Sequence, residues 1–181
     1  PHVFGLDYSP DLLGFARTLL GQSGTLLRGD MRTIPFVSTF DAIANFFTSF
    51  GYFQRDDENM AVAQGIACAL KPGGRFFMDY LNPDHVRANL VPESSRVAQD
   101  LVITERRWID EVGHRVNKVT EVRREEVIIN KSSESVRLYP ESTLRALLGK
   151  GGLTIQAMYG DYDGNAVQAD RPRQIIVGTR A

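Results

Sequence analysis

The sequence predicts an α/β fold with a mainly parallel sheet and an antiparallel β insertion. Over residues 1–97, short apolar segments alternate with helical patterns, which is typical of parallel strands joined by helices. Residues 98–139 are instead rich in Val, Ile, Thr, Arg and Glu, which favours antiparallel strands with one wet face. Residues 140–181 return to helix and strand patterns, and we expect them to complete the sheet of the first part.

The first half begins with an apolar strand at residues 2–7 that closes on Asp7. Ser9-Pro10-Asp11 predicts a helix start, because Ser9 can cap the free amides and proline suits the first turn. Gly21 ends this helix. Further strands are predicted at 25–28, 40–47 and 75–81, with a helix at 60–70 and a turn at 71–74.

The second half contains two groups of strands. Turn signals at 111–114 and 130–133 divide the segment 98–139 into three strands of a meander. Pro140-Glu141 begins a helix that stops at Gly151-Gly152. Strands at 153–159 and 173–179 follow, and a closing hairpin is the simplest arrangement for them.

Composition excludes several classes of protein. With 21 basic and 22 acidic residues, the chain lacks the positive charge of a nucleic-acid binder. No apolar run approaches the roughly 20 residues that span a bilayer, so we expect no membrane segment. The single cysteine, Cys68, excludes an internal disulfide and is expected in the core of an Ala-rich helix; a reducing cytoplasm is the expected location. The three histidines show no metal-ligand spacing.

Polar residues at predicted strand ends are candidates for binding, since ligands of open parallel sheets lie beyond the carboxyl ends of strands. Asp7 can accept from both hydroxyls of a ribose or can cap the following helix, and its position does not separate the two. Asp30 can accept from an exocyclic amine while Met31 packs on an adenine face, although an ordinary turn is the commoner explanation. The aromatic segment 45–53 suits an apolar cleft wall, and residues 79–82 end the next strand and can face the same cleft.

Four motifs occur in the order found in class I S-adenosylmethionine-dependent methyltransferases. They are residues 3–13, 29–32, 40–43 and 70–74. The closing segments 160–164 and 171–173 resemble a subgroup of small-molecule methyltransferases that carries an antiparallel insertion after the fifth strand. This resemblance implies a Rossmann-like methyltransferase sheet, S-adenosylmethionine as cofactor and a small-molecule methyl acceptor.

The resemblance also implies roles for single residues. Segment 7–8 would lie at the ribose of the cofactor. Asp30 would contact the adenine through its side chain and Met31 through its backbone. Segment 45–46 would approach the methionine part and the sulfonium. The cofactor-binding residues implied are Asp7, Tyr8, Asp30, Met31, Asn45 and Phe46.

One part of the family pattern is absent from the sequence. The family's first strand and its Gly-rich loop would precede residue 1, so we expect an N-terminally truncated sheet and an incomplete cofactor cradle. A missing strand would expose the edge of its neighbour, which invites a homodimer through that edge or through the β insertion. One alternative to a methyltransferase is therefore a non-catalytic domain that acts through self-association. Another is a dinucleotide-dependent oxidoreductase, because in these enzymes the second strand also ends on an acidic residue.

Methyl transfer needs the acceptor to be aligned, and a base only when the acceptor must lose a proton. The candidates for these roles are Tyr52, Tyr80, His85 and Tyr159. His85 follows a helix start, where an exposed or capping role is more common. The loop 161–163, with Arg171 near it, either shapes an acceptor pocket or forms a plain surface hairpin.

Overall fold

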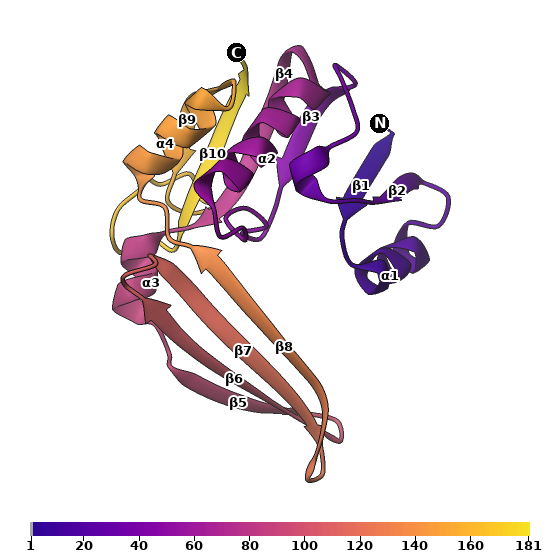
Figure 1. Ribbon diagram of the computed structural model, residues 1–181, viewed down its shortest axis with the longest axis vertical. Helices are drawn as coiled ribbons and strands as arrows, with labels where there is room; N and C mark the ends of the chain where they lie inside the picture. The colour runs from indigo at the N-terminus through magenta and orange to yellow at the C-terminus, as the bar shows by residue number, and fades with distance from the viewer. Residues whose placement is uncertain (1) are drawn as a thin grey trace.

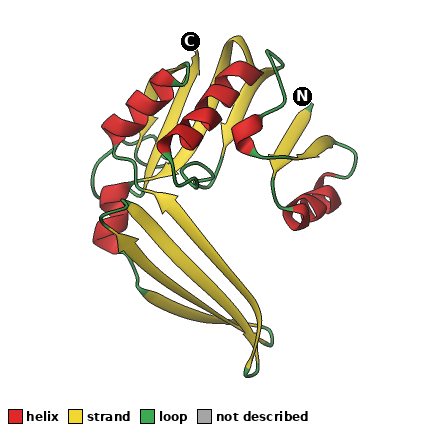
Figure 2. Cartoon of the chain, in the orientation of Figure 1, coloured by secondary structure: helices red, strands yellow, loops and turns green. Residues whose placement is uncertain are grey.

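The computed structural model describes residues 2–181; Pro1, on which the expectation about the start of the chain falls, lies outside the described residues. The strands form a two-stranded sheet and two four-stranded sheets (Figure 1). The four helices of the described chain pack beside these sheets or connect them (Figure 2). No helix among residues 2–181 is both long and apolar enough to cross a membrane.

The N-terminal unit is a strand, a helix and a second strand. Strand β1 (Val3–Asp7) runs parallel to β2 (Gly24–Arg28), and α1 (Pro10–Leu20) connects them, as predicted. Ser9 caps α1 by accepting from the Leu12 amide at 3.3 Å. Three large apolar side chains of α1 remain exposed, namely Leu12, Phe15 and Leu19.

The central sheet has the order β3-β4-β10-β9. Strands β3 and β4 are parallel, and β10 pairs antiparallel with both β4 and β9, which confirms the predicted closing hairpin. Helices α2 and α4 cover one face of this sheet (Figure 1), and the buried core lies between them and the strands. The elements are β3 (Phe40–Asn45), α2 (Asp56–Ala69), β4 (Leu70–Leu81), α4 (Glu141–Lys150), β9 (Leu153–Tyr159) and β10 (Arg173–Arg180).

Two details of the central unit differ from expectation. The predicted turn at 71–74 lies within the range of β4, where the register shifts from Phe40 opposite Leu70 to Ala42 opposite Arg75. Cys68 is exposed, so the core position predicted for it is wrong. The reason is helical phase: α2 turns a different set of residues to the core, which are Asn59, Val62, Ala63, Ile66, Ala67 and Ala69.

The antiparallel sheet has four strands, where the sequence predicted three. Its first strand starts at Glu93, before the predicted boundary at residue 98, and its last hairpin turns at Glu125-Glu126. Residues 130–133, predicted as a turn, lie inside the last strand, whose polar side chains face water. Helix α3 (Pro83–Asn89) leads into the strands β5 (Glu93–Ala98), β6 (Leu101–Asp110), β7 (Arg115–Arg124) and β8 (Val127–Arg137).

The N-terminal unit meets the central unit through aromatic rings instead of strand pairing. The ring centroids of Phe4 and Phe40 lie 5.3 Å apart, and those of Phe4 and Phe36 lie 5.9 Å apart. Within residues 2–181, β1 pairs only with β2 and β3 pairs only with β4. Each of these strands therefore keeps one edge without a ladder partner in the described chain.

Candidate functional site

Polar groups gather where β3 and β4 end, because the carboxyl ends of parallel strands lie at the same edge of a sheet. Asp79 near the end of β4 is fully buried. Its carboxylate pairs with Arg173 of β10, whose Nε lies 2.6 Å from Oδ1. The same carboxylate accepts from the Tyr162 hydroxyl at 2.7 Å and from the Phe47 amide at 3.0 Å. Asp79 thus joins three chain segments that are far apart in the sequence.

The segment after β3 has an unusual backbone. Phe47 and Thr48 have φ angles of 54° and 59°, in the left-handed region that non-glycine residues seldom occupy. Such conformations cost of order 1–3 kcal/mol each and persist where the surroundings enforce them. Here both amides donate to Asp79, the Phe47 amide to its side chain and the Thr48 amide to its carbonyl at 2.9 Å. Asp79 therefore fixes the shape of this loop.

Asn45, the last residue of β3, carries an unused hydrogen-bond acceptor. Its Oδ1 atom is buried and has no hydrogen-bond partner within residues 2–181. A buried acceptor without a partner is costly, so such an atom at a sheet edge points to a ligand that donates to it. Next to it, Phe46 is 49% exposed and its ring lies 5.2 Å from that of Phe77.

The acidic residues at the ends of β1 and β2 have partners within the chain. Asp7 accepts from the Ser9 amide at 2.7 Å, so its helix-capping role is observed. Asp30 caps the 3₁₀ turn η1 (Met31–Thr33) and pairs with Arg32, whose hydrogen bonds lower the pKa of this carboxyl. Met31 packs against the core, which leaves its backbone, and not its side chain, for a ligand.

Tyr8 lies at the surface beside the end of β1. Its side chain is 70% exposed, and the Arg28 guanidinium lies 5.8 Å from its ring centroid. Arg28 also donates from Nε to the Tyr8 carbonyl at 3.2 Å. The ring is therefore open to a ligand at this strand end.

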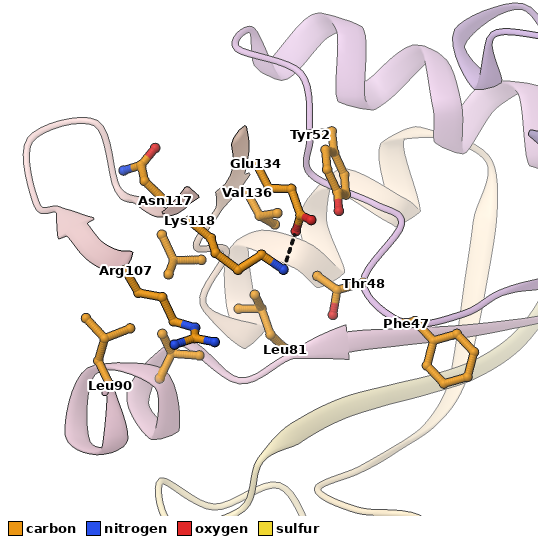
Figure 3. A pocket seen from close by; sticks show the side chains of 12 residues that line it. Phe47, Thr48, Tyr52, Leu81, Leu90, Arg107, Asn117, Lys118, Glu134 and Val136 are labelled. Carbon is orange, nitrogen blue, oxygen red and sulfur yellow. Dashed lines mark ion pairs between the residues drawn. The ribbon is translucent and has the colours of Figure 1, made fainter. Parts of the chain in front are cut away.

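A pocket of about 270 Å³ opens between this edge of the central sheet and the antiparallel sheet (Figure 3). In Figure 3, Tyr52 points toward Glu134, which forms an ion pair with Lys118 at 3.0 Å. The lining is mixed, with apolar side chains beside charged ones. Its lining residues are Phe47, Thr48, Tyr52, Leu81, Val86, Leu90, Arg107, Val116, Asn117, Lys118, Glu134 and Val136.

Arg115 of β7 fastens the loop that carries Tyr52 to the antiparallel sheet. Its side chain is only 4% exposed and donates to the carbonyls of Tyr52 at 2.9 Å and Phe53 at 3.0 Å. It also donates to the Ser135 hydroxyl at 2.7 Å and to the Gly51 carbonyl at 3.3 Å. Burial lowers the pKa of this guanidinium.

The hydroxyl of Tyr52 keeps its proton at neutral pH. Burial, and secondarily the negative charge of Glu134, raise the pKa of this phenol above its ordinary value of 10.0. A protonated phenol donates hydrogen bonds, so Tyr52 suits acceptor positioning and does not suit proton removal.

The other candidates for positioning or proton removal lie elsewhere. Tyr80 is fully buried; its hydroxyl donates to the Arg137 carbonyl and accepts from the Tyr139 amide, and burial raises its pKa. His85 Nδ1 lies 3.0 Å from the Asp170 carbonyl, to which it can donate a hydrogen bond. Neither Tyr80, His85 nor Tyr159 lines the pocket. Sequence reasoning missed the pocket residues Arg107, Lys118 and Glu134, which the strand register alone reveals.

The comparisons with known proteins agree with this architecture. Residues 1–74 match a family model described as a methyltransferase domain. The chain is 26% identical over 185 residues to a cypemycin N-terminal methyltransferase from a Streptomyces species, covering 97% of this chain and 72% of the relative. A structure of an S-adenosylmethionine-dependent methyltransferase from Clostridium acetobutylicum superimposes with a TM-score of 0.87 at 17% identity, covering all of this chain and 76% of the other.

The chain is similar in sequence and fold to S-adenosylmethionine-dependent methyltransferases. A third match is an S-adenosylmethionine-bound amino pentose methyltransferase, CalS10 of Micromonospora echinaspora, with a TM-score of 0.71 at 22% identity over all of this chain and 75% of the other. The chain shares with these structures a mixed α/β, Rossmann-like fold, as its sequence predicted.

The residues at the strand ends have groups that fit S-adenosylmethionine. The unpartnered Asn45 Oδ1 is suited to a donor such as the ammonium of the methionine part. Within residues 2–181 the Asp7 carboxylate accepts one hydrogen bond, from the Ser9 amide, and a carboxylate has further lone pairs for ribose hydroxyls. The exposed Tyr8 directly follows Asp7 in sequence, and Met31 directly follows Asp30.

Proposed function

We propose that this protein is an S-adenosylmethionine-dependent methyltransferase that methylates an amine of a small molecule. The observation that carries the proposal is the pocket of about 270 Å³ that begins at the end of β3, beside the segment that follows Asn45. The names of two relatives support an amine acceptor, since one is an N-terminal methyltransferase and another an amino pentose methyltransferase.

When bound, S-adenosylmethionine supplies an electrophilic methyl group, which the acceptor nitrogen takes as the carbon–sulfur bond breaks. Asn45, Asp7 and Asp30 would hold the cofactor. The apolar side chains of the pocket exclude water from the acceptor, and alignment supplies most of the rate enhancement, as in other two-substrate displacements.

The amine must also give up a proton. Tyr52 stays protonated, so it orients the acceptor by hydrogen bonding. Among the described residues that line the pocket, Glu134 is the only carboxylate. Glu134 therefore binds the ammonium form of the acceptor and receives its proton.

Calorimetry with S-adenosylhomocysteine tests this proposal directly. We expect N45A to weaken binding about tenfold, because a buried acceptor facing a charged donor is lost. N130A is the matched control, since Asn130 is exposed on β8, and should leave the affinity unchanged. Absence of heat at millimolar ligand with the unaltered chain would refute the proposed function for this chain.

Self-association without catalysis is the second candidate. The unpaired edges of β1 and β3 in the described chain favour it, as do Val3 and Phe4, which are 49% and 41% exposed. Sedimentation equilibrium distinguishes the two: a dimer that binds no S-adenosylhomocysteine would support it, and a monomer would refute it.

A further inference from the structure

Three charged side chains form a row across the antiparallel sheet, which we call the charged row. Arg107 of β6 lies opposite Lys118 of β7, and Lys118 lies opposite Glu134 of β8. Residues directly opposite one another share a face of the sheet. All three line the pocket, and Figure 3 shows them on the same wall.

The two cations of the charged row are next to each other, and each is paired with one acid. Lys118 pairs with Glu134 at 3.0 Å, and Arg107 pairs with Glu105, two residues before it on β6. Arg107 also donates to the Ser94 hydroxyl at 3.0 Å. Like charges in directly opposed positions destabilise a sheet, so the pair Arg107 and Lys118 lowers the stability of the fold at this place in the pocket.

An anion between the two cations would remove that cost. Their side chains are 25% and 30% exposed, so each is partly shielded from water and still accessible. Arginine and lysine bind carboxylate and phosphate oxygens with charge-assisted hydrogen bonds, which are about twice as strong as neutral ones. A neutral hydroxyl would leave the repulsion between Arg107 and Lys118 in place.

We propose that the acceptor carries an anionic oxygen group, a carboxylate or a phosphate, close to its amine. The anion lies between Arg107 and Lys118, the ammonium lies at Glu134, and the apolar body packs against lining residues such as Leu81 and Leu90. The charged row thus selects amino-acid-like acceptors over neutral amines. This inference rests on the proposed function, since it names the substrate class of the same pocket.

Matched probes in calorimetry test this specificity. The probes are phenylalanine, phenylalaninamide and the aminophosphonate analogue of phenylalanine, titrated with saturating S-adenosylhomocysteine at a pH where every amine is protonated. We expect the carboxylate or the phosphonate to bind at least about tenfold more tightly than the amide. The two anionic probes also show which anion the row prefers.

Single variants connect the preference to the charged row. R107Q and K118Q should each remove most of the preference for the anionic probe while keeping the affinity for S-adenosylhomocysteine. R106Q is the matched control, because Arg106 is the neighbouring residue, points to the other face and pairs with Glu93 at 3.2 Å. It should leave the preference unchanged.

Three results would overturn the inference: equal binding of amide and anion, equal loss of preference in R106Q and R107Q, or no binding of any anionic probe. The proposed function fails separately, when S-adenosylhomocysteine itself does not bind. The probes are then titrated alone, and their preference still supports or overturns the anion site.

Discussion

Replacing Asp79 with Asn removes the charge from the carboxylate that joins β3, β4, β10 and the loop of Tyr162. Asp79 is fully buried and Arg173 is 22% exposed, so the variant leaves a largely buried guanidinium without its partner. Breaking a buried ion pair costs about 3–5 kcal/mol, and the partial exposure of Arg173 places this case at the lower end, about 3 kcal/mol. For a chain of 181 residues this corresponds to a drop in Tm of about 6–12 °C.

Urea unfolding followed by circular dichroism measures this change in the free energy of unfolding. D41N is the matched control, because the Asp41 carboxylate also pairs with a cation, Lys71 at 2.7 Å, but its side chain is 86% exposed. We expect no measurable change for D41N, as for most exposed ion pairs. The double variant D79N/R173Q should be less destabilised than the sum of the two single variants.

The reasoning is refuted if D79N and D41N unfold at the same urea concentration. Additivity of D79N and R173Q would equally show that the two side chains do not act as a pair.

Four further predictions concern packing, hydrogen bonding and pH. G178A should destabilise the chain strongly in thermal unfolding, because a Cβ at this position would collide with a carbonyl of β9. G149A should instead stabilise the chain by about 0.5–1 kcal/mol, because Gly149 lies within a helix and has open space around it. Y139F should cost about 1–2 kcal/mol in urea unfolding, since its hydroxyl donates to a carboxylate of α2 at 2.6 Å. R115M should lower the free energy of unfolding by about 2–4 kcal/mol in the same measurement, because it leaves buried carbonyls without a hydrogen-bond donor. A smaller loss than that of Y139F would contradict the anchoring role of Arg115. Hydrogen bonds, of which that from Asn165 contributes most, lower the pKa of Asp161 below 3.8. The Asp161 carboxylate therefore stabilises the loop fully above pH 3.8, and this stabilisation is lost as the pH falls through the lowered pKa. An Asn165 amide resonance that titrates at or above pH 3.8 would contradict this prediction.

Local signals explain why much of the fold was predictable from the sequence. Ser9 and Pro10 begin α1 through interactions within one turn, and the apolar run before Asn45 becomes a strand as predicted. Such features depend on residues a few positions apart, which the sequence displays directly. Strand β1 therefore ends at Asp7 as predicted, and β3 ends at Asn45, two residues before the predicted end at residue 47.

The pocket at the edge of the central sheet depends on strand register, which the sequence analysis predicted incorrectly. Polar residues 130–133 predicted a turn, but they continue an exposed strand, and the hairpin turns at Glu125-Glu126 instead. A different turn would place a different residue opposite Lys118. Asp79 and its partner Arg173 are 94 positions apart, and a contact of this kind follows from tertiary packing alone.

The bonds from Arg115 make the Tyr52 loop and the antiparallel sheet one rigid body. The sheet is anchored to the core at Tyr139, whose hydroxyl lies 2.6 Å from Asp56, while residues 90–92 connect it on the other side. Any swing of the sheet that admits a substrate would therefore pivot near Tyr139 and carry Tyr52 along with Glu134. The mouth would widen against Thr48, and Tyr52 and Glu134, which we propose to hold the amine, would keep their spacing throughout the motion.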